Sequence, residues 1–367
     1  LGAGISAAVA AVGLAFAEPL LRAMHVAPEV LAVGAPYLRL SFLLGFGFVF
    51  GMLVNGVLNG AGDSTTPMVL TVIQVSISLL AEWLLIFGHA GLPALGVRGA
   101  ALGVAVGQGV GITLALRVLL RGGTRVHLRP AHLRPAPALL GRIVRLAWPP
   151  ALQMIGGFLV TVFFLRLVGD FGPKAQAAYS IGLRLGMVGP MLAFPLAGAA
   201  ATLVGQNLGA GRVRRAWASL GVGLAVHAPL LWSVAAVLYV FRTPIVAAFA
   251  GDPEVIRLGA ELLRYQAGTF AAFGLYFVFL RGLQGAGDVA VPMVLSLGNS
   301  VFFTLPLGVW LATEAGLGWG PEGVFMASMV GAFAVTAMTG AWLATGRWAR
   351  RAPRRTAAAG SGDPVGA

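Results

Sequence analysis

Glu82 is the residue of this sequence whose type and position point most directly to chemistry. It lies in the apolar run 79–86, where a carboxylate costs about 2.5 kcal/mol or more to insert into a bilayer and is a functional candidate for that reason. Gln74 and Ser78 precede it by eight and four residues, so a helix would place all three side chains on one face. We therefore predict a polar site formed by Glu82, Ser78 and Gln74 that can bind a proton or another cation within the membrane. A carboxylate near the outer interface, or one paired with an arginine, is the alternative.

The composition predicts the kind of element that must position these residues. Of the 367 residues, 58% are hydrophobic and 10% are charged, and the mean hydropathy is +0.88. An ordinary soluble domain carries about 25% charged residues, so soluble enzymes, disordered scaffolds and nucleic-acid modules are excluded. We predict an all-α polytopic membrane protein. The sequence contains no cysteine, which excludes disulfides, iron–sulfur clusters and thiolate metal sites, and no histidine pair has the spacing of metal ligands.

Apolar runs between polar or Gly/Pro-rich segments indicate ten membrane-spanning helices. Fifteen residues separate Pro67, near the start of the third helix, from Glu82, which places the carboxylate about 22 Å along that helix. The sixth run is too long for one straight span, and Pro190 and Pro195 predict a kink in it. The ten ranges are 3–22, 36–58, 67–88, 97–120, 142–168, 175–206, 214–241, 256–282, 292–312 and 322–346.

Basic residues are distributed unequally between the two ends of these helices. Alternate connections, together with the C-terminal segment, hold fifteen arginines, whereas the opposite connections hold seven arginine or lysine residues. By the positive-inside rule the first set is cytoplasmic. We therefore expect a multi-pass protein of the inner (plasma) membrane with a cytoplasmic C-terminus. The net charge of +13 then reflects contact with the lipid bilayer and not with nucleic acid.

The sequence contains an internal repeat. Residues 28–70 recur at 253–295, an offset of 225, with 17 identities in 43 positions and no gap. The second predicted helix corresponds to the eighth, so the repeat is parallel and its unit is six helices. Two complete units would have twelve helices, but ten are present and the chain opens on Leu1. We therefore expect a sequence that lacks the first two helices of its first unit.

Two motifs resemble those of a known transporter family. One is the duplicated Gly-Ala-Gly-Asp…Pro-Met at 60–68 and 285–293, and the other is Gly-Gln-Asn-Leu-Gly-Ala within 203–216. Together they resemble the multidrug and toxic compound extrusion (MATE) family, and the resemblance covers nearly the whole chain as that family's helices 3 to 12. We interpret both motifs as structural turns, because glycine permits a tight turn and aspartate accepts N–H bonds at the next helix start. The turn residues are Gly62, Asp63, Pro67, Gly205, Gln206, Asn207, Gly287, Asp288 and Pro292.

The resemblance implies two pseudo-symmetric helix bundles, or lobes, around a V-shaped cleft. Substrates of the family leave by alternating access, driven by inward flow of protons or sodium. On this basis we expect four N-lobe helices at 1–120, an arginine-rich cytoplasmic linker at 121–141, a six-helix C-lobe at 142–346 and a cytoplasmic tail at 347–367.

The resemblance also assigns site residues. In one branch of the family the coupling carboxylates lie on helices 1 and 5, and in another they lie on helices 7 and 10. Glu82 aligns with the acidic position of helix 5, whereas Phe273 stands where the other branch has aspartate on helix 10, which favours the N-lobe branch. Val104 falls where relatives often carry threonine, which disfavours sodium. The candidates for the substrate cleft are Gln108, Gln153, Phe273 and Asn299.

We predict a secondary antiporter, and not an enzyme, that exports small drug-like or cationic organic compounds in exchange for H⁺ or Na⁺. It is expected to need no cofactor and no metal and to act as a monomer. A flippase for lipid-linked oligosaccharides of the same superfamily is one alternative, but it would line its cleft with several cationic residues. A polytopic membrane enzyme is the other, and it would need a catalytic cluster at one membrane face that the sequence does not contain.

Overall fold

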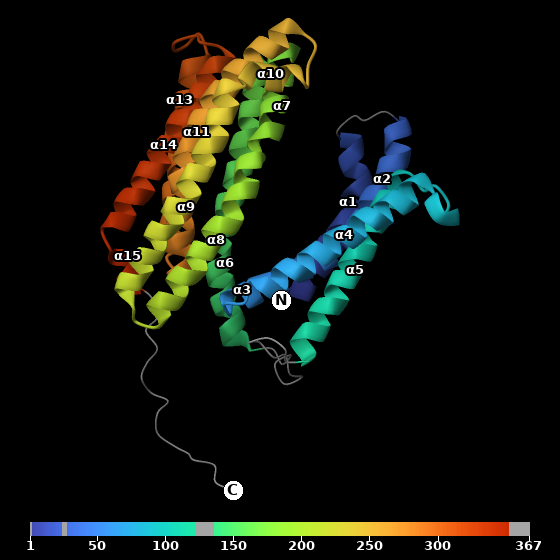
Figure 1. Cartoon of the computed structure of the whole chain (residues 1–367). Coiled ribbons are helices and arrows are strands. Elements are labelled where there is room, and N and C mark those ends of the chain that lie inside the picture. Colours follow the sequence, from blue (N-terminus) through green and yellow to red (C-terminus); the bar gives the residue numbers. More distant parts are fainter. Residues whose placement is uncertain (1, 24–27, 122–135, 352–367) are drawn as a thin grey trace. The chain divides into compact units, whose positions relative to one another are not determined.

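The computed structural model describes residues 2–23, 28–121 and 136–351 (Figure 1). Every regular element in these ranges is helical, which confirms the all-α class. The helices form two compact units, Leu1–Leu140 and Gly141–Ala367. Most of the linker predicted at 121–141, and most of the tail predicted at 347–367, falls outside the described residues.

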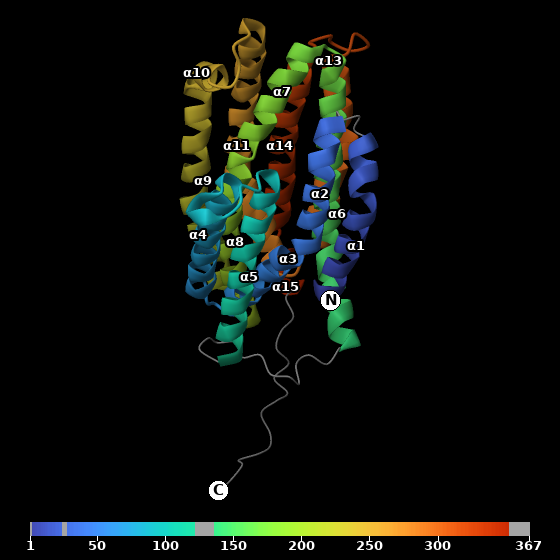
Figure 2. The ribbon, with the colours of Figure 1, turned by 90° about the vertical axis from the view of Figure 1, so that its right-hand side faces the viewer.

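The first unit contains a closely packed pair of long helices, α4 and α5, which lie side by side in Figures 1 and 2. The preceding helices α2 and α3 form one apolar segment, Gly34–Gly60, that is interrupted at Gly45. Helix α3 packs against α1 and against α5. The elements of this unit are α1 (Gly2–Ala23), α2 (Pro28–Leu44), α3 (Phe46–Gly60), α4 (Thr65–Phe87), η1 (His89–Gly91) and α5 (Val97–Arg121).

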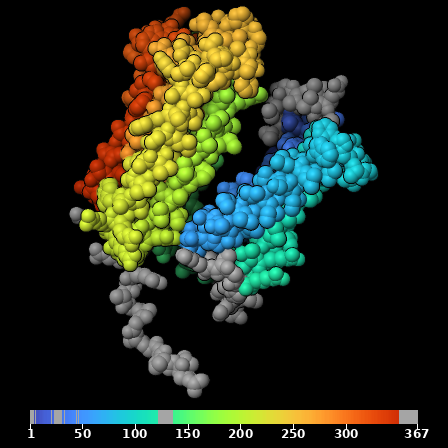
Figure 3. All heavy atoms as spheres, viewed as in Figure 1, coloured from blue at the N-terminus to red at the C-terminus, as the bar shows by residue number. Residues whose placement is uncertain are grey.

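The second unit is built around one long helix, α11, which contacts α7, α8, α9 and α14. Side chains fill the spaces between its ribbons, as the space-filling view shows (Figure 3). Leu231, Leu283 and Trp348 are among its fully buried side chains. The elements are α6 (Pro137–Gly169), α7 (Pro173–Gly186), α8 (Val188–Gly209), α9 (Val213–Val240), α10 (Arg242–Ala247), α11 (Pro253–Gly285), α12 (Ala290–Asn299), η3 (Ser300–Thr304), α13 (Leu305–Ala312), α14 (Pro321–Ala344) and α15 (Arg347–Arg351).

The predicted spans are all helical in the structure. Within the described residues, eight helices are long and apolar enough to cross a membrane, and they correspond to eight of the ten predicted ranges. The other two ranges are α1, whose apolar part is Ser6–Pro19, and α11, which is 33 residues long but carries charged residues in its first half. The chain is therefore a multi-pass helical membrane protein.

Two helices are interrupted where proline removes a backbone donor. The segment predicted to kink divides into α7 and α8 at Met187, one turn before Pro190. Proline has no N–H, and its ring clashes with the carbonyl four residues earlier, here that of Gly186, so the break precedes the proline. A second interruption was not predicted: η3 is a π-helical turn that ends two residues before Pro306.

The two copies of the repeated turn have the same backbone and different side-chain partners. Gly62 and Gly287 have φ values of +82° and +83°, in the left-handed region that favours glycine. The Asp63 carboxylate accepts hydrogen bonds from the Thr66 N–H at 3.0 Å and from the Thr66 hydroxyl at 2.7 Å. Asp288 is buried and accepts one from the indole N–H of Trp342 on α14 at 2.9 Å. One aspartate thus holds the start of the next helix, and the other joins the turn to a third helix.

An ion pair joins the starts of α7 and α11. Oδ1 of Asp252 accepts the Glu254 N–H at 2.8 Å and so caps α11, while Oδ2 lies 2.8 Å from Nζ of Lys174. The hydrogen bond from Lys174, followed by the backbone N–H of Glu254, holds the pKa of the Asp252 carboxyl below its usual range. A lowered pKa means that the folded state binds this proton less readily than the unfolded state. The ion pair therefore stabilises the fold at neutral pH, and its contribution is lost as pH falls through the lowered pKa.

We predict that Asp252→Asn makes the melting temperature less sensitive to acid. Asparagine still caps a helix, so the substitution removes the charge and keeps the cap. Between pH 6 and pH 3 the melting temperature of the wild-type protein in detergent should fall further than that of the variant. Asp170→Asn is the matched control, because Asp170 is exposed and makes no ion pair with a described residue. Equal acid sensitivity of the wild type and Asp252→Asn would contradict this role.

Candidate functional site

The three predicted coupling residues lie on the face of α4 that packs against α5. A Cβ atom built on Gly103 of α5 would lie 2.5 Å from Cγ of Glu82, and one built on Gly107 would overlap Oγ of Ser78. A Cβ atom on Gly111 would lie 2.6 Å from Oε1 of Gln74. The structure therefore brings Glu82, Ser78 and Gln74 together as one stripe opposite a row of glycines.

Glycine spacing on α5 explains why the two helices approach so closely. Gly103, Gly107 and Gly111 recur every fourth residue, so they lie on one face of the helix and all are buried. Small residues at this spacing let membrane helices pack backbone against backbone. A Cβ atom on Gly107 would also lie 2.7 Å from the Gln74 carbonyl oxygen and 2.8 Å from the Ser78 nitrogen. The groove on α5 thus holds the polar stripe of α4.

The neighbouring face of α4 is apolar and exposed. The side chains of Leu79 and Trp83 are 62% and 50% exposed, which is the arrangement expected for contact with lipid. Glu82 is half-buried and makes no ion pair with an arginine in the part of the chain that the structure describes. It lies five residues, about 8 Å, from Phe87 at the end of α4. Its position is thus near one end of the span and on the protein-facing side.

A separate cavity of about 380 Å³ lies in the same unit, among α1, α2, α3 and α5. Gln108, a predicted cleft residue, lines this cavity, and its Oε1 is buried with no hydrogen-bond partner among the described residues. Oγ of Ser6, on α1, is also buried without a hydrogen-bond partner among the described residues. Sequence reasoning missed Ser6, Tyr37 and Ser41, because their presence in the wall of this cavity depends on how helices distant in the sequence pack.

The two features occupy neighbouring faces of α5. Gly103 and Gly107 contact the polar stripe of α4, whereas the residues that follow them, Val104 and Gln108, line the cavity. Successive residues of a helix differ in direction by about 100°. A change in the α4–α5 contact would therefore move one wall of the cavity.

Two predicted cleft residues of the second unit meet at Tyr276. Nε2 of Gln153 donates a hydrogen bond to the Tyr276 hydroxyl at 3.0 Å. The Phe273 ring lies 5.9 Å from the Tyr276 ring and 5.1 Å from that of Phe277, measured between centroids. The side chain of Asn299 lies elsewhere: it is 8% exposed and donates to the Gly331 carbonyl of α14 at 3.1 Å.

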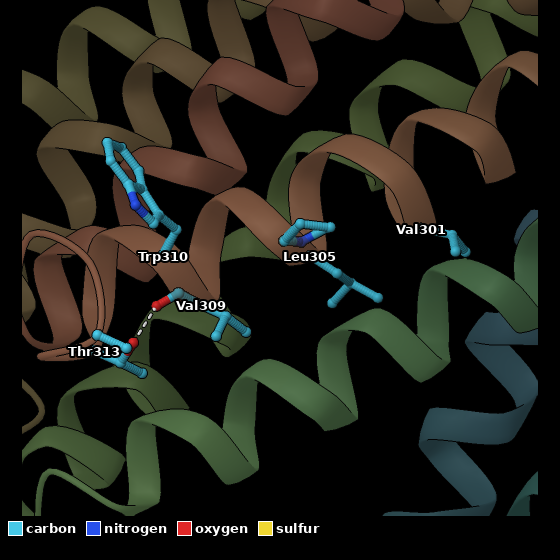
Figure 4. A pocket seen from close by; sticks show the side chains of 7 residues that line it. Val301, Leu305, Val309, Trp310 and Thr313 are labelled. Carbon is cyan, nitrogen blue, oxygen red and sulfur yellow. Dashed lines mark hydrogen bonds between the residues drawn. The ribbon is translucent and has the colours of Figure 1, made fainter.

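The second unit also contains a buried histidine and an apolar groove. His227 is buried, and its Nδ1 lies 2.7 Å from the carbonyl oxygen of Gly274. An apolar groove of about 440 Å³ runs along η3 and α13 (Figure 4). The Thr313 hydroxyl at its wall donates a hydrogen bond to the Val309 carbonyl at 2.9 Å. Among the described residues, no three His, Cys, Asp or Glu side chains are placed to hold a metal ion.

The signature motifs meet at one end of the second unit. A Cβ atom on Gly205 of α8 would lie 2.9 Å from the Gly285 carbonyl oxygen of α11. Nδ2 of Asn207 donates to the Ser219 hydroxyl at 3.2 Å and to the Leu203 carbonyl at 2.8 Å. These contacts hold helix ends together.

The helical fold and the internal repeat define a multi-pass membrane protein with the architecture typical of transporters. The sequence matches the model of the MatE family over residues 1–84 and 149–310. Because this match covers about two thirds of the chain, the protein belongs to the MatE family. The predicted relationship to MATE transporters is thereby confirmed.

Known proteins of this family resemble the chain along most of its length. The probable multidrug resistance protein NorM of Thermotoga maritima is 25% identical over 269 residues, which are 73% of this chain and 58% of the relative. The multidrug resistance protein PmpM of Pseudomonas aeruginosa is 27% identical over 326 residues, 86% of this chain and 67% of the relative. The chain thus spans about three fifths to two thirds of these proteins. A solved outward-facing structure of a multidrug resistance MATE family transporter superposes with a TM-score of 0.85 at 17% identity, over 95% of this chain and 77% of that one, which shows the shared fold.

We predict that Gly107→Ala destabilises the protein and that Gly109→Ala does not. The added methyl group at position 107 overlaps Ser78 and must separate α4 from α5, which should cost about 1–3 kcal/mol of unfolding free energy. Gly109 has open space around its Cβ position, so alanine there should leave stability unchanged or raise it by up to about 1 kcal/mol through helix propensity. Thermal unfolding in detergent measures both. If Gly107→Ala melts at or above the wild-type temperature, the two helices do not pack as described.

Proposed function

We propose that the protein is a secondary antiporter that exports small amphipathic, often cationic, organic compounds in exchange for protons. The observation that carries this proposal is the Glu82 carboxylate, held in a protein-facing polar stripe of a membrane-spanning helix in a member of the MatE family. A carboxylate in such a place is costly to insert and can bind and release a cation. The names of the relatives, which are multidrug resistance proteins, support the substrate class.

Protons fit this site better than sodium. A proton needs one carboxylate oxygen, whereas a sodium ion needs several oxygen ligands in place of its water shell. Beside Glu82 the stripe offers Ser78 and Gln74, and the neighbouring cavity-lining position on α5 is the apolar Val104. Glu82 would be the proton-binding group, with Ser78 and Gln74 as polar neighbours.

The cavity beside α5 is the better candidate for substrate. Its volume of about 380 Å³ falls in the range of small-molecule pockets, and its wall is mostly apolar with a few hydroxyl and amide groups. Such walls suit amphipathic compounds of varied shape. Gln153 and Phe273, which meet at Tyr276, would offer a polar and aromatic surface in the second unit.

Coupling would then pass through α5. Protonation removes the charge of Glu82 and so changes the force between α4 and α5 at Gly103. Because Val104 and Gln108 line the cavity, a shift of α5 would change the shape of the substrate site. The protonated and deprotonated forms would thus favour different conformations. A substrate that binds the deprotonated form more tightly would displace the proton.

The arrangement in the membrane is part of the proposal. We place the protein in the inner membrane with a cytoplasmic C-terminus, on the arginine distribution, and take residues 1–120 and 142–346 as its N-lobe and C-lobe. It would act as a monomer. The rival function, flipping of a lipid-linked pyrophosphate compound, would call for cations around the substrate, and the residues that line the cavity include no arginine or lysine.

We predict that Glu82→Gln removes most of the proton-driven efflux. Ethidium efflux would be measured in everted vesicles, driven first by a proton gradient and then by a sodium gradient. The wild type should respond to protons, and the variant should lose about tenfold or more of that rate, because glutamine cannot carry the proton. Glu314→Gln is the matched control, since Glu314 is exposed between α13 and α14.

Two results would contradict the proposal in different ways. If Glu82→Gln pumps as fast as the wild type, Glu82 is an interface residue and the coupling assignment fails. If the wild type moves no ethidium or other organic cation under either gradient, drug export itself fails, and lipid-linked substrates become the leading alternative.

A further inference from the structure

A second cavity, of about 430 Å³, lies at the end of the second unit where the two signature motifs meet. It is distinct from the polar stripe of α4 and from the cavity beside α5, since both of those lie in the first unit. Its wall combines the end of α8, the end of α11 with the turn that follows, and the start of α6. The side chains with polar or charged groups are those of Arg142, Arg281 and Gln284.

The wall of this cavity carries positive charge that no carboxylate in the wall neutralises. Arg142 of α6 and Arg281 of α11 are the charged residues of its wall, and neither forms an ion pair with any residue that the structure describes. The nearest acid in sequence, Asp288, is not part of the wall, and its Oδ2 accepts a hydrogen bond from Trp342. Two guanidinium groups thus share a cavity without a carboxylate in its wall.

The surroundings of Arg281 fix its guanidinium and leave a donor edge. Its Cζ atom lies 5.1 Å from the centroid of the Phe194 ring, so the ring covers the group. Its Nη1 donates a hydrogen bond to Oε1 of Gln284 at 3.1 Å. Its Nε is buried and has no hydrogen-bond partner among the described residues. Guanidinium edges of this kind match the paired oxygens of phosphate or carboxylate groups.

The turn itself does not require this arginine. At the repeat offset of 225, Arg281 corresponds to Gly56, while Gly285, Ala286 and Gly287 correspond to identical residues in the first copy. Both turns adopt the same backbone conformation at their second glycine. The two copies therefore share a turn, and the cation is a feature of the second copy alone.

We propose that this cavity binds a phosphate-bearing anion, with Arg281 and Arg142 contacting the phosphate and the Gln284 amide as a further donor. The group could belong to the headgroup of an anionic phospholipid or to a soluble phosphate compound. Basic pockets between membrane helices, near their ends, hold anionic headgroups in general. The apolar wall residues Leu146 and Leu208 would lie against the rest of a lipid. This proposal is independent of drug export.

The test measures saturable binding to the purified protein in an uncharged detergent. The probes are dioctanoyl phosphatidylglycerol, dioctanoyl phosphatidylcholine as a zwitterionic lipid with the same chains, and inorganic phosphate. We expect phosphatidylglycerol or phosphate to bind more tightly than phosphatidylcholine, and salt to weaken the binding. Arg281→Gln should raise the dissociation constant about tenfold or more, and Arg142→Gln about threefold. Arg281→Lys should fall between the wild type and Arg281→Gln, because lysine keeps the charge and loses the paired donors.

Arg214→Gln is the matched control. Arg214 lies at the start of α9, is exposed, and does not line the cavity, so its loss should change the dissociation constant less than about twofold. Binding of phosphatidylglycerol alone would identify a lipid headgroup, and equal binding of phosphate would identify a soluble anion. The proposal is overturned if Arg281→Gln and Arg142→Gln bind as the wild type does, or if no probe binds saturably. Arg142 is exposed, so its variant keeps the test decisive should Arg281→Gln fail to fold.

Discussion

The backbone contact between α4 and α5 is the constraint on which the proposed chemistry depends. Gly103 and Gly107 have no side chains, so Glu82 and Ser78 fit against α5 while the apolar residues of α4 face outward. Larger residues at these glycines would move the polar stripe away from its neighbour. Helix α5 also places Gln108 in the adjacent cavity, so one helix contacts the proposed ion site and forms part of the proposed substrate site. Close packing of small residues is a means of positioning polar groups here as well as a source of stability.

The repeat shows how one local structure can serve two purposes. Gly62 and Gly287 adopt the same left-handed conformation, yet Asp63 bonds to Thr66 in the next helix and Asp288 bonds to Trp342 of α14. The difference follows from sequence, because Thr66 is replaced by Val291 in the second copy. A turn set by glycines tolerates such changes around it, and Arg281 of the phosphate cavity we propose stands where the first copy has Gly56.

Much of the fold could be predicted from the sequence, because apolar runs and proline and glycine positions are local signals. The stripe of Gln74, Ser78 and Glu82 was predictable as well, since helical spacing alone places these residues on one face. The π-helical turn at Ser300–Thr304 was not predicted. Neither were the roles of Ser6 and Tyr37 in the first cavity, nor the isolation of Arg281 from carboxylates, because these depend on how helices distant in the sequence pack.

The central claim is that substrate and proton compete through Glu82, and proton release on substrate binding tests it most directly. Purified protein in weakly buffered detergent solution would be mixed with ethidium while a pH-sensitive dye is read. The account predicts that the wild type and Glu314→Gln release protons when they bind ethidium, and that Glu82→Gln releases none. Equal proton release by Glu82→Gln would show that the coupling proton is held elsewhere and would contradict the account.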